Sequence, residues 1–339
     1  HIIFKKMKAS FILLTFICLF ISITNKMQFT AKVMHEMNRA GGYTISPDKK
    51  YIIFSYSKWS EFEGKKTNYL KYKEIDSTEE PKDLTTPEEG KADVNPVMSS
   101  AFPNFVIFTR GADLYYIDFP PKEGSQPQRL SSYPIEFNDY KLKQNTLIFS
   151  ASVYFKCDTL NCTKELDDEE ATHDYKVYTN IEMFHWDHWL TEGKGNHIFY
   201  QRIETAENDT KLVLVGEPKD LTAGMETNAP TMDAGSESYD ISNDGTKVAF
   251  TGLDRSNEAM NTSWKVYLYE LENMKEPMLL STKNDGRSNC PRFNKDDTKI
   301  GFLTMTIPLL ESDTFYLSVY NVLTNTIDQV VNVIDKSIN

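Results

Sequence analysis

The sequence lacks several patterns that would narrow its function at once. No G-x-S-x-G segment occurs in its 339 residues, so it contains no nucleophile elbow of an α/β-hydrolase. Basic residues are not in excess, since 37 Lys and Arg stand against 49 Asp and Glu, and this acidic balance argues against a nucleic-acid partner. No amphipathic helical pattern of useful length follows residue 24, whereas Tyr and Phe are abundant and apolar runs are short. Together these features favour strands over helices.

Only one long apolar run is present, ASFILLTFICLFISIT at 9–24, and Lys5, Lys6 and Lys8 precede it. A basic stretch before an apolar core too short to span a bilayer comfortably predicts a secretory signal peptide within residues 1–24. Met7 is then the natural initiator. An uncleaved membrane anchor is the alternative. We expect a secreted, extracellular protein with no membrane attachment after signal cleavage.

Cysteine is scarce, and one of the four cysteines, Cys18, lies in the apolar run. Cys157 and Cys162 flank a short turn in KCDTLNCT and predict a local disulfide, which leaves Cys290 as a buried thiol. A zinc site would need a second Cys or His pair, which Cys290 alone does not supply, so neither a metal nor a cofactor is expected. Three sequons give candidate glycosylation sites at Asn161, Asn208 and Asn261.

One short motif, Pro-x-x-Leu-Ser/Thr, occurs four times, as PKDLT (81–85), PQRLS (127–131), PKDLT (218–222) and PMLLS (277–281). The first interval is about 45 residues and the second about twice that, which is typical of a β-propeller with blades of roughly 40–45 residues. Proline is tolerated at an outer edge strand, where its missing N–H need not pair. We therefore expect the motif to begin the fourth, outer strand of each blade.

The other strands of each blade also have recognisable sequences. SPDKKYIIF (46–54), SNDGTKVAF (242–250) and FNKDDTKIGF (293–302) predict hairpins between first and second strands, and aromatic–aliphatic alternations such as KVYLYEL (265–271) predict third strands. The predicted fold is all-β, a propeller of four-stranded antiparallel blades. The blades are expected at 42–90, 95–132, 137–224, 238–283 and 289–339, within a propeller region of 25–339.

The third predicted blade is twice the usual length. We interpret 154–195 as an insertion between its second and third strands, and the alternative is a degenerate blade without a closing motif. ELDDEE (165–170) is expected to be a solvated acidic loop, because the spaced oxygen ligands of a calcium loop are missing. The last blade has no clear outer strand.

With these segments identified, the chain resembles the N-terminal propeller of the secreted dipeptidyl-peptidase V and acylaminoacyl-peptidase branch of the prolyl oligopeptidase family. The matching stretches are SPDKKYIIF, the insertion FHWDHWLTEGKGNHIFY followed by KDLT, and CPRFNKDDTKIGFLTM. This resemblance implies seven blades above a C-terminal α/β-hydrolase with a Ser-Asp-His triad. Five blades are visible here, and GRSNC (286–290) lacks the second glycine of the nucleophile motif, so no catalytic residue is carried over. The chain is expected to be an N-terminal fragment, inactive alone.

The segment HWDHW holds the densest chemistry. The candidate substrate-binding residues are Glu182, His185, Trp186 and Asp187. A carboxylate of Asp187 or Glu182 would pair with the ammonium of a peptide amino terminus, and Trp186 would stack on its side chains. The alternative is that Trp186 and Trp189 only pack the insertion against the third blade. A metal site at His185, His188 and His197 is disfavoured by the intervening tryptophans.

Three functions remain open from the sequence. The first is the propeller portion of a secreted serine-type exopeptidase, which binds short peptides and gates their access to the C-terminal hydrolase domain of the same parent chain. The second is a stand-alone, non-catalytic propeller that binds a protein or glycan. The third is a propeller with its own pair of hydrolytic carboxylates facing one cavity.

Overall fold

The computed structural model describes residues 29–60, 64–88, 90–179, 183–185, 187–231, 234–254, 260–273, 276–282 and 286–330. The predicted signal peptide at 1–24 lies outside these residues. Among the helices described, none has the length and apolar character needed to cross a bilayer.

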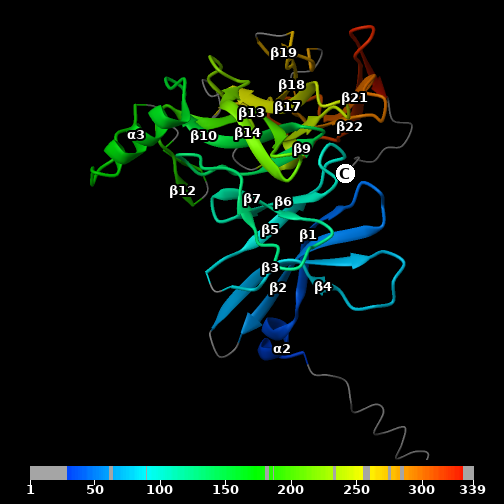
Figure 1. The fold of residues 1–339 in the computed structure, drawn as a ribbon. Helices are drawn as coiled ribbons and strands as arrows, with labels where there is room; N and C mark the ends of the chain where they lie inside the picture. The colour runs from blue at the N-terminus through cyan, green and yellow to red at the C-terminus, as the bar shows by residue number, and fades with distance from the viewer. Residues whose placement is uncertain are drawn as a thin grey trace, which may run out of the picture.

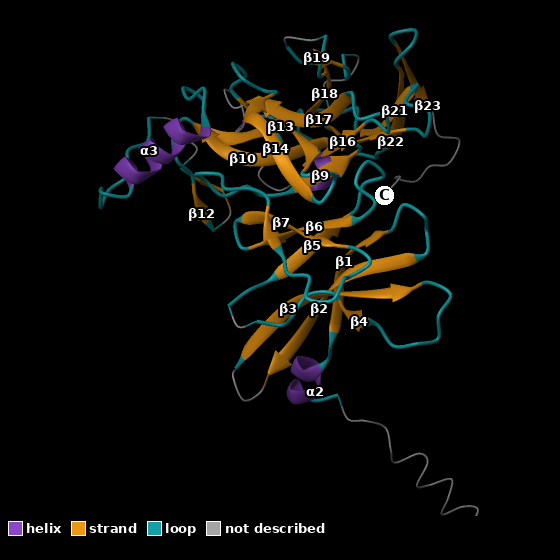
Figure 2. Cartoon of the chain, viewed as in Figure 1, coloured by secondary structure: helices purple, strands orange, loops and turns teal. Residues whose placement is uncertain are grey.

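Strands dominate the described chain and form five antiparallel sheets that follow one another in sequence order (Figures 1 and 2). In chain order, the sheets consist of β1 (Arg39–Ile45), β2 (Tyr51–Ser60), β3 (Lys65–Glu74) and β4 (Lys82–Asp83); β5 (Asp93–Val97), β6 (Phe105–Arg110), β7 (Asp113–Asp118) and β8 (Gln128–Arg129); β9 (Tyr140–Lys143), β10 (Thr146–Tyr154), β13 (Lys194–Ala206) and β14 (Lys211–Asp220); β16 (Tyr239–Ile241), β17 (Lys247–Asp254), β18 (Lys265–Glu270) and β19 (Met278–Leu279); and β20 (Ser288–Phe293), β21 (Lys299–Thr304), β22 (Tyr316–Asn321) and β23 (Thr326–Val330). An extra strand, β15 (Thr227–Asn228), pairs with the far end of β17. The all-β, propeller-like class is confirmed, and the sheets are called the first to fifth blades below.

The turns between first and second strands are held by their own polar side chains. In the first blade the Ser46 hydroxyl donates to Asp48 Oδ1 (2.6 Å) and accepts from the backbone N–H of Tyr51 (2.9 Å). Ser242 makes the same pair of bonds in the fourth blade, to Asp244 and from Lys247. Such short polar side chains stabilise tight turns by bonding to nearby backbone, so these sequences form hairpins.

In the first four blades the Pro-x-x-Leu-Ser/Thr motif fastens the outer strand to the third strand, although in the third blade Pro218 lies near the end of β14 and does not begin it, contrary to expectation. In the first blade the N–H of Leu84 donates to the carbonyl of Leu70 (2.8 Å), and the Thr85 hydroxyl accepts from the N–H of Leu70 (2.9 Å). The equivalent hydroxyl and N–H pairs are Ser131 with Leu114 (2.8 Å), Thr222 with Ile198 (3.3 Å) and Ser281 with Val266 (3.0 Å). All four hydroxyl-bearing residues are buried. The motif recurs in the first four blades because each of them has a buried N–H that this hydroxyl satisfies.

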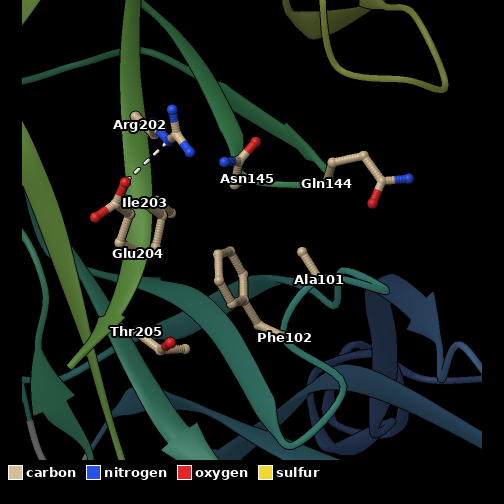
Figure 3. A pocket seen from close by; sticks show the side chains of 8 residues that line it. All are labelled: Ala101, Phe102, Gln144, Asn145, Arg202, Ile203, Glu204 and Thr205. Carbon is tan, nitrogen blue, oxygen red and sulfur yellow. Dashed lines mark ion pairs between the residues drawn. The ribbon is translucent and has the colours of Figure 1, made fainter. Parts of the chain in front are cut away.

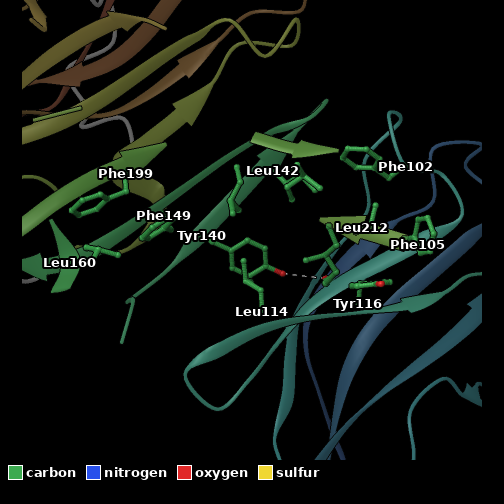
Figure 4. Close-up of a cluster of buried hydrophobic side chains, with 14 of the residues drawn as sticks. Phe102, Phe105, Leu114, Tyr116, Tyr140, Leu142, Phe149, Leu160, Phe199 and Leu212 are labelled. Carbon is green, nitrogen blue, oxygen red and sulfur yellow. Dashed lines mark hydrogen bonds between the residues drawn. The ribbon is translucent and has the colours of Figure 1, made fainter. Parts of the chain in front are cut away.

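Four apolar clusters lie between consecutive blades. The cluster between the second and third blades joins Phe105 and Leu114 to Leu142 and Phe149 (Figure 4). Within it the Tyr140 hydroxyl donates to the backbone carbonyls of Asn95 (2.5 Å) and Ile107 (3.2 Å). Aromatic side chains make up much of this cluster. The Tyr140 hydroxyl is buried with its ring and therefore needs a hydrogen-bond partner such as these carbonyls.

Two lysines of β9 connect the third blade to the inner strand of the fourth. Lys141 Nζ donates to the carbonyl of Tyr239, and Lys143 Nζ donates to the carbonyl of Ile241, both at 2.5 Å. Carbonyls on the open side of an inner edge strand have no neighbouring strand that could donate a hydrogen bond, and the two ammonium groups supply the missing donors. Burial, reinforced by the positive charge of Arg292, lowers the pKa of Lys141 to about 8.

The two terminal blades each contribute to only one of the four apolar clusters. In the first blade Tyr43 and Ile45 are 66% and 49% exposed, and they pair with Phe54 and Ile52 on the same face of the sheet. No strand pairing joins the first sheet to the fifth within the part of the chain that the structure describes. Both faces of the second, third and fourth blades, in contrast, contribute to apolar clusters.

Three expectations about individual elements are wrong. ELDDEE is not a loop, because it forms the end of helix α3 (Leu160–Glu170), which begins at the N-cap Thr159 and carries an ion pair between Lys164 and Asp168. A second short helix, α2 (Ala31–Glu36), also lies outside the predicted signal peptide. The fifth blade does have an outer strand, β23, which follows a turn with Asn325 in the left-handed region (φ 54°) in place of a proline motif.

Candidate functional site

The insertion of the third blade is a closed loop anchored at its base. It leaves the blade after Tyr154 at the end of β10 and returns at Lys194, and these two residues are paired across the sheet. The N–H of Phe155 donates to the carbonyl of Gly193 (2.9 Å), and Lys194 forms an ion pair with Asp167 of α3 (2.5 Å). The described part of the insertion contains one helix and one short hairpin, not a four-stranded sheet, which disfavours the degenerate-blade alternative. In Figure 1, α3 and β12 extend to one side of this blade.

Helix α3 is fixed to the blade by a disulfide and a buried threonine. Cys157 and Cys162 are bonded (S–S 2.01 Å), which ties the first turn of α3 to the end of β10. Thr163 is fully buried, and its hydroxyl accepts from the N–H of Tyr154 (3.3 Å). The rest of α3 projects away from the blade with its carboxylates.

The HWDHW segment forms the hairpin of β11 (Phe184–His185) and β12 (His188–Trp189). Asp187 lies in its turn with an 86% exposed side chain, 3.2 Å from His188 Nε2. Trp189 is 64% exposed, so the expectation that it packs the insertion against the blade is wrong. Among the described residues, the aromatic rings beside it are those of Tyr178 and Phe184, with centroids 6.1 and 5.7 Å away. Glu182 and Trp186 lie outside the described residues, and only the backbone of His185 is described.

A buried histidine–carboxylate pair lies below the insertion and was missed by the sequence analysis. His197 Nδ1 is 2.6 Å from Asp220 Oδ2, and His197 is only 2% exposed. Asp220 Oδ1 accepts from both the backbone N–H and the hydroxyl of Thr222. The ring of Phe155 stacks on the imidazole at 5.4 Å, and His197 Nε2 is buried with no hydrogen-bond partner. The pair joins β13, β14 and the base of the insertion.

No group of three or more His, Cys, Asp or Glu side chains that would suit a metal ion occurs among the described residues. His188 is exposed in the hairpin, while His197 is buried in the blade and bonded to Asp220. These two positions differ in both burial and partners.

An open depression of about 410 Å³ lies between the second and third blades (Figure 3). Its polar rim contains Gln144, Asn145 and the ion pair of Arg202 with Glu204 (3.1 Å). Asn145 immediately precedes β10, whereas the insertion leaves the far end of that strand after nine residues. The depression and the insertion therefore lie at opposite ends of the blade and do not form one site.

The GRSNC segment has the geometry of a strand, not of a nucleophile elbow. It leads into β20, and a Cβ on Gly286 would lie 2.2 Å from the carbonyl oxygen of Met305. Cys290 adopts a left-handed conformation (φ 55°) in a β-bulge and is half-buried instead of buried. Burial raises the pKa of its thiol, which is the opposite of what a nucleophile needs.

The three sequons lie in different surroundings. Asn208 is exposed at the tip of the hairpin between β13 and β14, with φ of 56°. Asn161 lies in the first turn of α3, where Thr163 of its sequon is buried. Asn261 is half-buried and accepts from the N–H of Ser263 (2.8 Å). Only Asn208 presents both its amide and its threonine to solvent among the three.

Comparison with solved structures identifies the fold. An acylaminoacyl peptidase of Pyrococcus horikoshii superimposes on this chain with a TM-score of 0.56 and 10% sequence identity. The alignment covers 92% of this chain and 42% of the Pyrococcus chain, so the two share a fold. At this identity the likeness shows the fold alone. No protein-family model matches the chain.

The sequence relatives are more particular, since they are dipeptidyl-peptidase 5 proteins. A probable dipeptidyl-peptidase 5 of Emericella nidulans is 27% identical over 172 residues, which cover 48% of this chain and 23% of the relative. A dipeptidyl-peptidase 5 of Schizosaccharomyces pombe is 30% identical over 146 residues, which cover 42% of this chain and 21% of the relative. A dipeptidyl-peptidase 5 of Porphyromonas endodontalis is 23% identical over 301 residues, which cover 84% of this chain and 39% of the relative. These relatives confirm the resemblance, and the chain spans well under half the length of each.

Proposed function

We propose that this chain is the propeller portion of a secreted, serine-type dipeptidyl peptidase. In this proposal the propeller binds short peptides and gates their access to a C-terminal α/β-hydrolase domain of the same parent chain. The relatives carry the first half of the proposal, since all three are dipeptidyl peptidases that extend far beyond the matched region.

The exposed face of the first blade supports the proposal that this chain is part of a longer propeller. Tyr43 and Ile45 of the first blade expose apolar area that the middle blades bury against neighbours. Exposed sheet faces of this kind mark interaction surfaces. Two further blades of the parent chain, as the resemblance implies, would cover the outer faces of the first and fifth blades.

Secretion is part of the proposal and is supported by three features. The apolar run at 9–24 has the composition of a signal peptide, Cys157 and Cys162 form a disulfide, and Asn208 offers an exposed sequon. Disulfides persist mainly in oxidising compartments.

The proposed role of the insertion is to hold the peptide amino terminus. Asp187 is an exposed carboxylate in a hairpin turn whose only described ionic partner is His188. A charge-assisted hydrogen bond to an ammonium contributes about 1.5–3 kcal/mol. In the complete enzyme, Asp187→Asn should therefore raise KM for dipeptidyl substrates with a free amino terminus more than for N-blocked ones.

The test is made in two stages. Expressed alone, this chain should hydrolyse neither dipeptidyl nor acyl-amino-acid chromogenic substrates, because it contains no nucleophile elbow. The parent chain should hydrolyse the dipeptidyl substrates and be inhibited by a serine-directed phosphonate. Phosphonate-sensitive turnover by the chain alone would overturn the assignment of catalysis to a separate hydrolase domain.

A further inference from the structure

The tip of the insertion exposes a cluster of aromatic rings that the fold does not use. We define the aromatic tip as Tyr178, Phe184 and Trp189. Phe184 and Trp189 are 57% and 64% exposed, although they lie opposite each other in the hairpin. Met183 and Val177, on the same two segments, are 42% and 67% exposed. Large apolar side chains grouped on a surface in this way are typical of binding sites.

The aromatic tip is held in place by polar contacts at its base. The Tyr178 hydroxyl donates to the carbonyl of Leu190 (2.8 Å), which sets its ring beside that of Trp189. One residue further on, the N–H of Thr179 donates to Glu192 Oε2 (2.7 Å). The disulfide of Cys157 fixes the other end of the insertion. A surface that is already ordered loses little conformational entropy when a partner binds.

Carboxylates of the same insertion lie near the aromatic tip, since Glu170 at the end of α3 is 4.0 Å from Lys176, two residues before Tyr178. Helix α3 carries five Asp and Glu residues; three of them have ion-pair partners, whereas Glu165 and Glu169 are exposed. Asp174 and Asp187, on the segments that flank the tip, are also exposed. The chain as a whole has a net charge of −12. A partner that presents positive charges around an apolar side chain would match this surface.

We propose that the aromatic tip is a docking site for a basic, apolar peptide segment, in which a large apolar side chain is flanked by Lys or Arg. The apolar side chain would lie on Trp189 and Phe184, and its cationic neighbours would pair with the exposed carboxylates of α3 and not with Asp187. An anionic lipid surface or a second copy of this chain would instead bring like charges together, which is unfavourable. The site uses no residue of a hydrolase domain, so this inference goes beyond the proposed peptidase function.

The probe is an N-acetylated, C-amidated peptide in which a Leu-Phe pair lies between two lysines on each side, with a fluorophore on an added C-terminal cysteine. Binding is followed by anisotropy on the purified chain. The blocked amino terminus separates this site from the recognition of a free ammonium by Asp187. The peptide should bind saturably, and affinity should fall as salt is raised. A matched peptide with glutamates in place of the lysines should not bind.

Two sets of variants test the surface. The double variant Phe184→Ala/Trp189→Ala should weaken binding at least about tenfold, as expected for truncated aromatic anchors. Glu165→Gln/Glu169→Gln, which leaves the apolar contacts and the fold untouched, should weaken binding and reduce its salt dependence. The control Tyr43→Ala removes an equally exposed ring from the first blade (66%) and should change nothing.

Several outcomes would overturn the proposal. These are equal binding of the acidic peptide, unchanged affinity in both double variants, self-association of the chain that Trp189→Ala abolishes, and binding to phosphatidylserine vesicles through the same residues. Because the peptide is N-blocked and no turnover is measured, none of these outcomes bears on the peptidase assignment.

Discussion

The hydroxyl of Thr85 accepts a hydrogen bond from the backbone N–H of Leu70 at 2.9 Å, and this bond joins the outer strand of the first blade to its third strand. The same relationship recurs between Ser131 and Leu114, and between Ser281 and Val266. It gives the repeated motif a structural purpose that does not depend on function.

This relationship predicts a stability effect. Thr85→Val keeps the shape of the side chain but leaves the buried N–H of Leu70 without a partner, which should lower the free energy of unfolding by about 1–3 kcal/mol. Thr85→Ser retains the hydroxyl and should recover most of the loss. Thr86→Val, at the exposed neighbouring position, is the matched control. Urea unfolding measures all three, and equal stability of Thr85→Val and the wild type would contradict the assigned role.

The two PKDLT segments offer a second comparison, because identical sequences have different surroundings. Asp220 is bonded to buried His197, whereas Asp83 is half-exposed beside Lys71 at 2.6 Å. Asp220→Ala should destabilise the chain by about 3 kcal/mol, since it leaves a buried imidazole N–H unpaired, and Asp83→Ala should cost less than about 1 kcal/mol. The readout is again the midpoint of denaturant unfolding. Equal losses of unfolding free energy in the two variants would show that the buried His197–Asp220 pair stabilises the chain no more than the exposed Lys71–Asp83 pair does.

Lys141 predicts a pH dependence of stability. Its pKa in the folded chain is about 8, below the ordinary 10.5, so between these values the unfolded chain binds more protons than the folded one. Stability therefore rises with pH in this window, because deprotonation relieves the cost of a buried ammonium, by up to about 3 kcal/mol.

The control for this prediction is Lys141→Met, which has no titrating group. The stability of the wild type relative to this variant should increase from pH 7.5 to pH 10 in urea unfolding. A constant difference between the two chains would contradict the lowered pKa of Lys141.

Glycosylation should distinguish the three sequons. Asn208 and its threonine are exposed at a hairpin tip, whereas the sequons of Asn161 and Asn261 include buried hydroxyl residues, Thr163 and Ser263. When the chain is secreted from eukaryotic cells, Asn208→Gln should remove most of the mobility shift that glycosidase treatment also removes. Asn161→Gln and Asn261→Gln serve as controls, and a full shift retained by Asn208→Gln would contradict this ranking.

Much of the fold could be predicted because its signals are local. Ser46 to Phe54 contains the turn residues, their hydrogen-bond partners and the following strand within nine positions, and the Pro-x-x-Leu-Ser/Thr motif carries its own buried hydroxyl. Helix α3 was missed because it has no apolar stripe and buries only Leu160 and Thr163. Its N-cap Thr159 and the spacing of Lys164 and Asp168 were the signals that could have revealed it.

The site was less predictable because it depends on the register of a long hairpin. His197 and Asp220 are 23 residues apart, and the pairing of β13 with the consecutive strand β14 brings them together. HWDHW drew attention to the insertion, but composition alone could not show that Trp189 faces solvent and not the blade. Exposure of a tryptophan depends on how the whole insertion is anchored.

The central claim is that this chain is the propeller portion of a longer serine-type dipeptidyl peptidase, and one measurement tests it most directly. The native protein is captured from its producing cells with an antibody against the insertion, treated with a fluorescent fluorophosphonate, and resolved by mass. We predict a labelled species substantially larger than the 39.0 kDa of this chain, because the nucleophile and the remaining blades belong to the parent chain. A single unlabelled species of about the mass of this chain would contradict the claim and favour a stand-alone binding propeller.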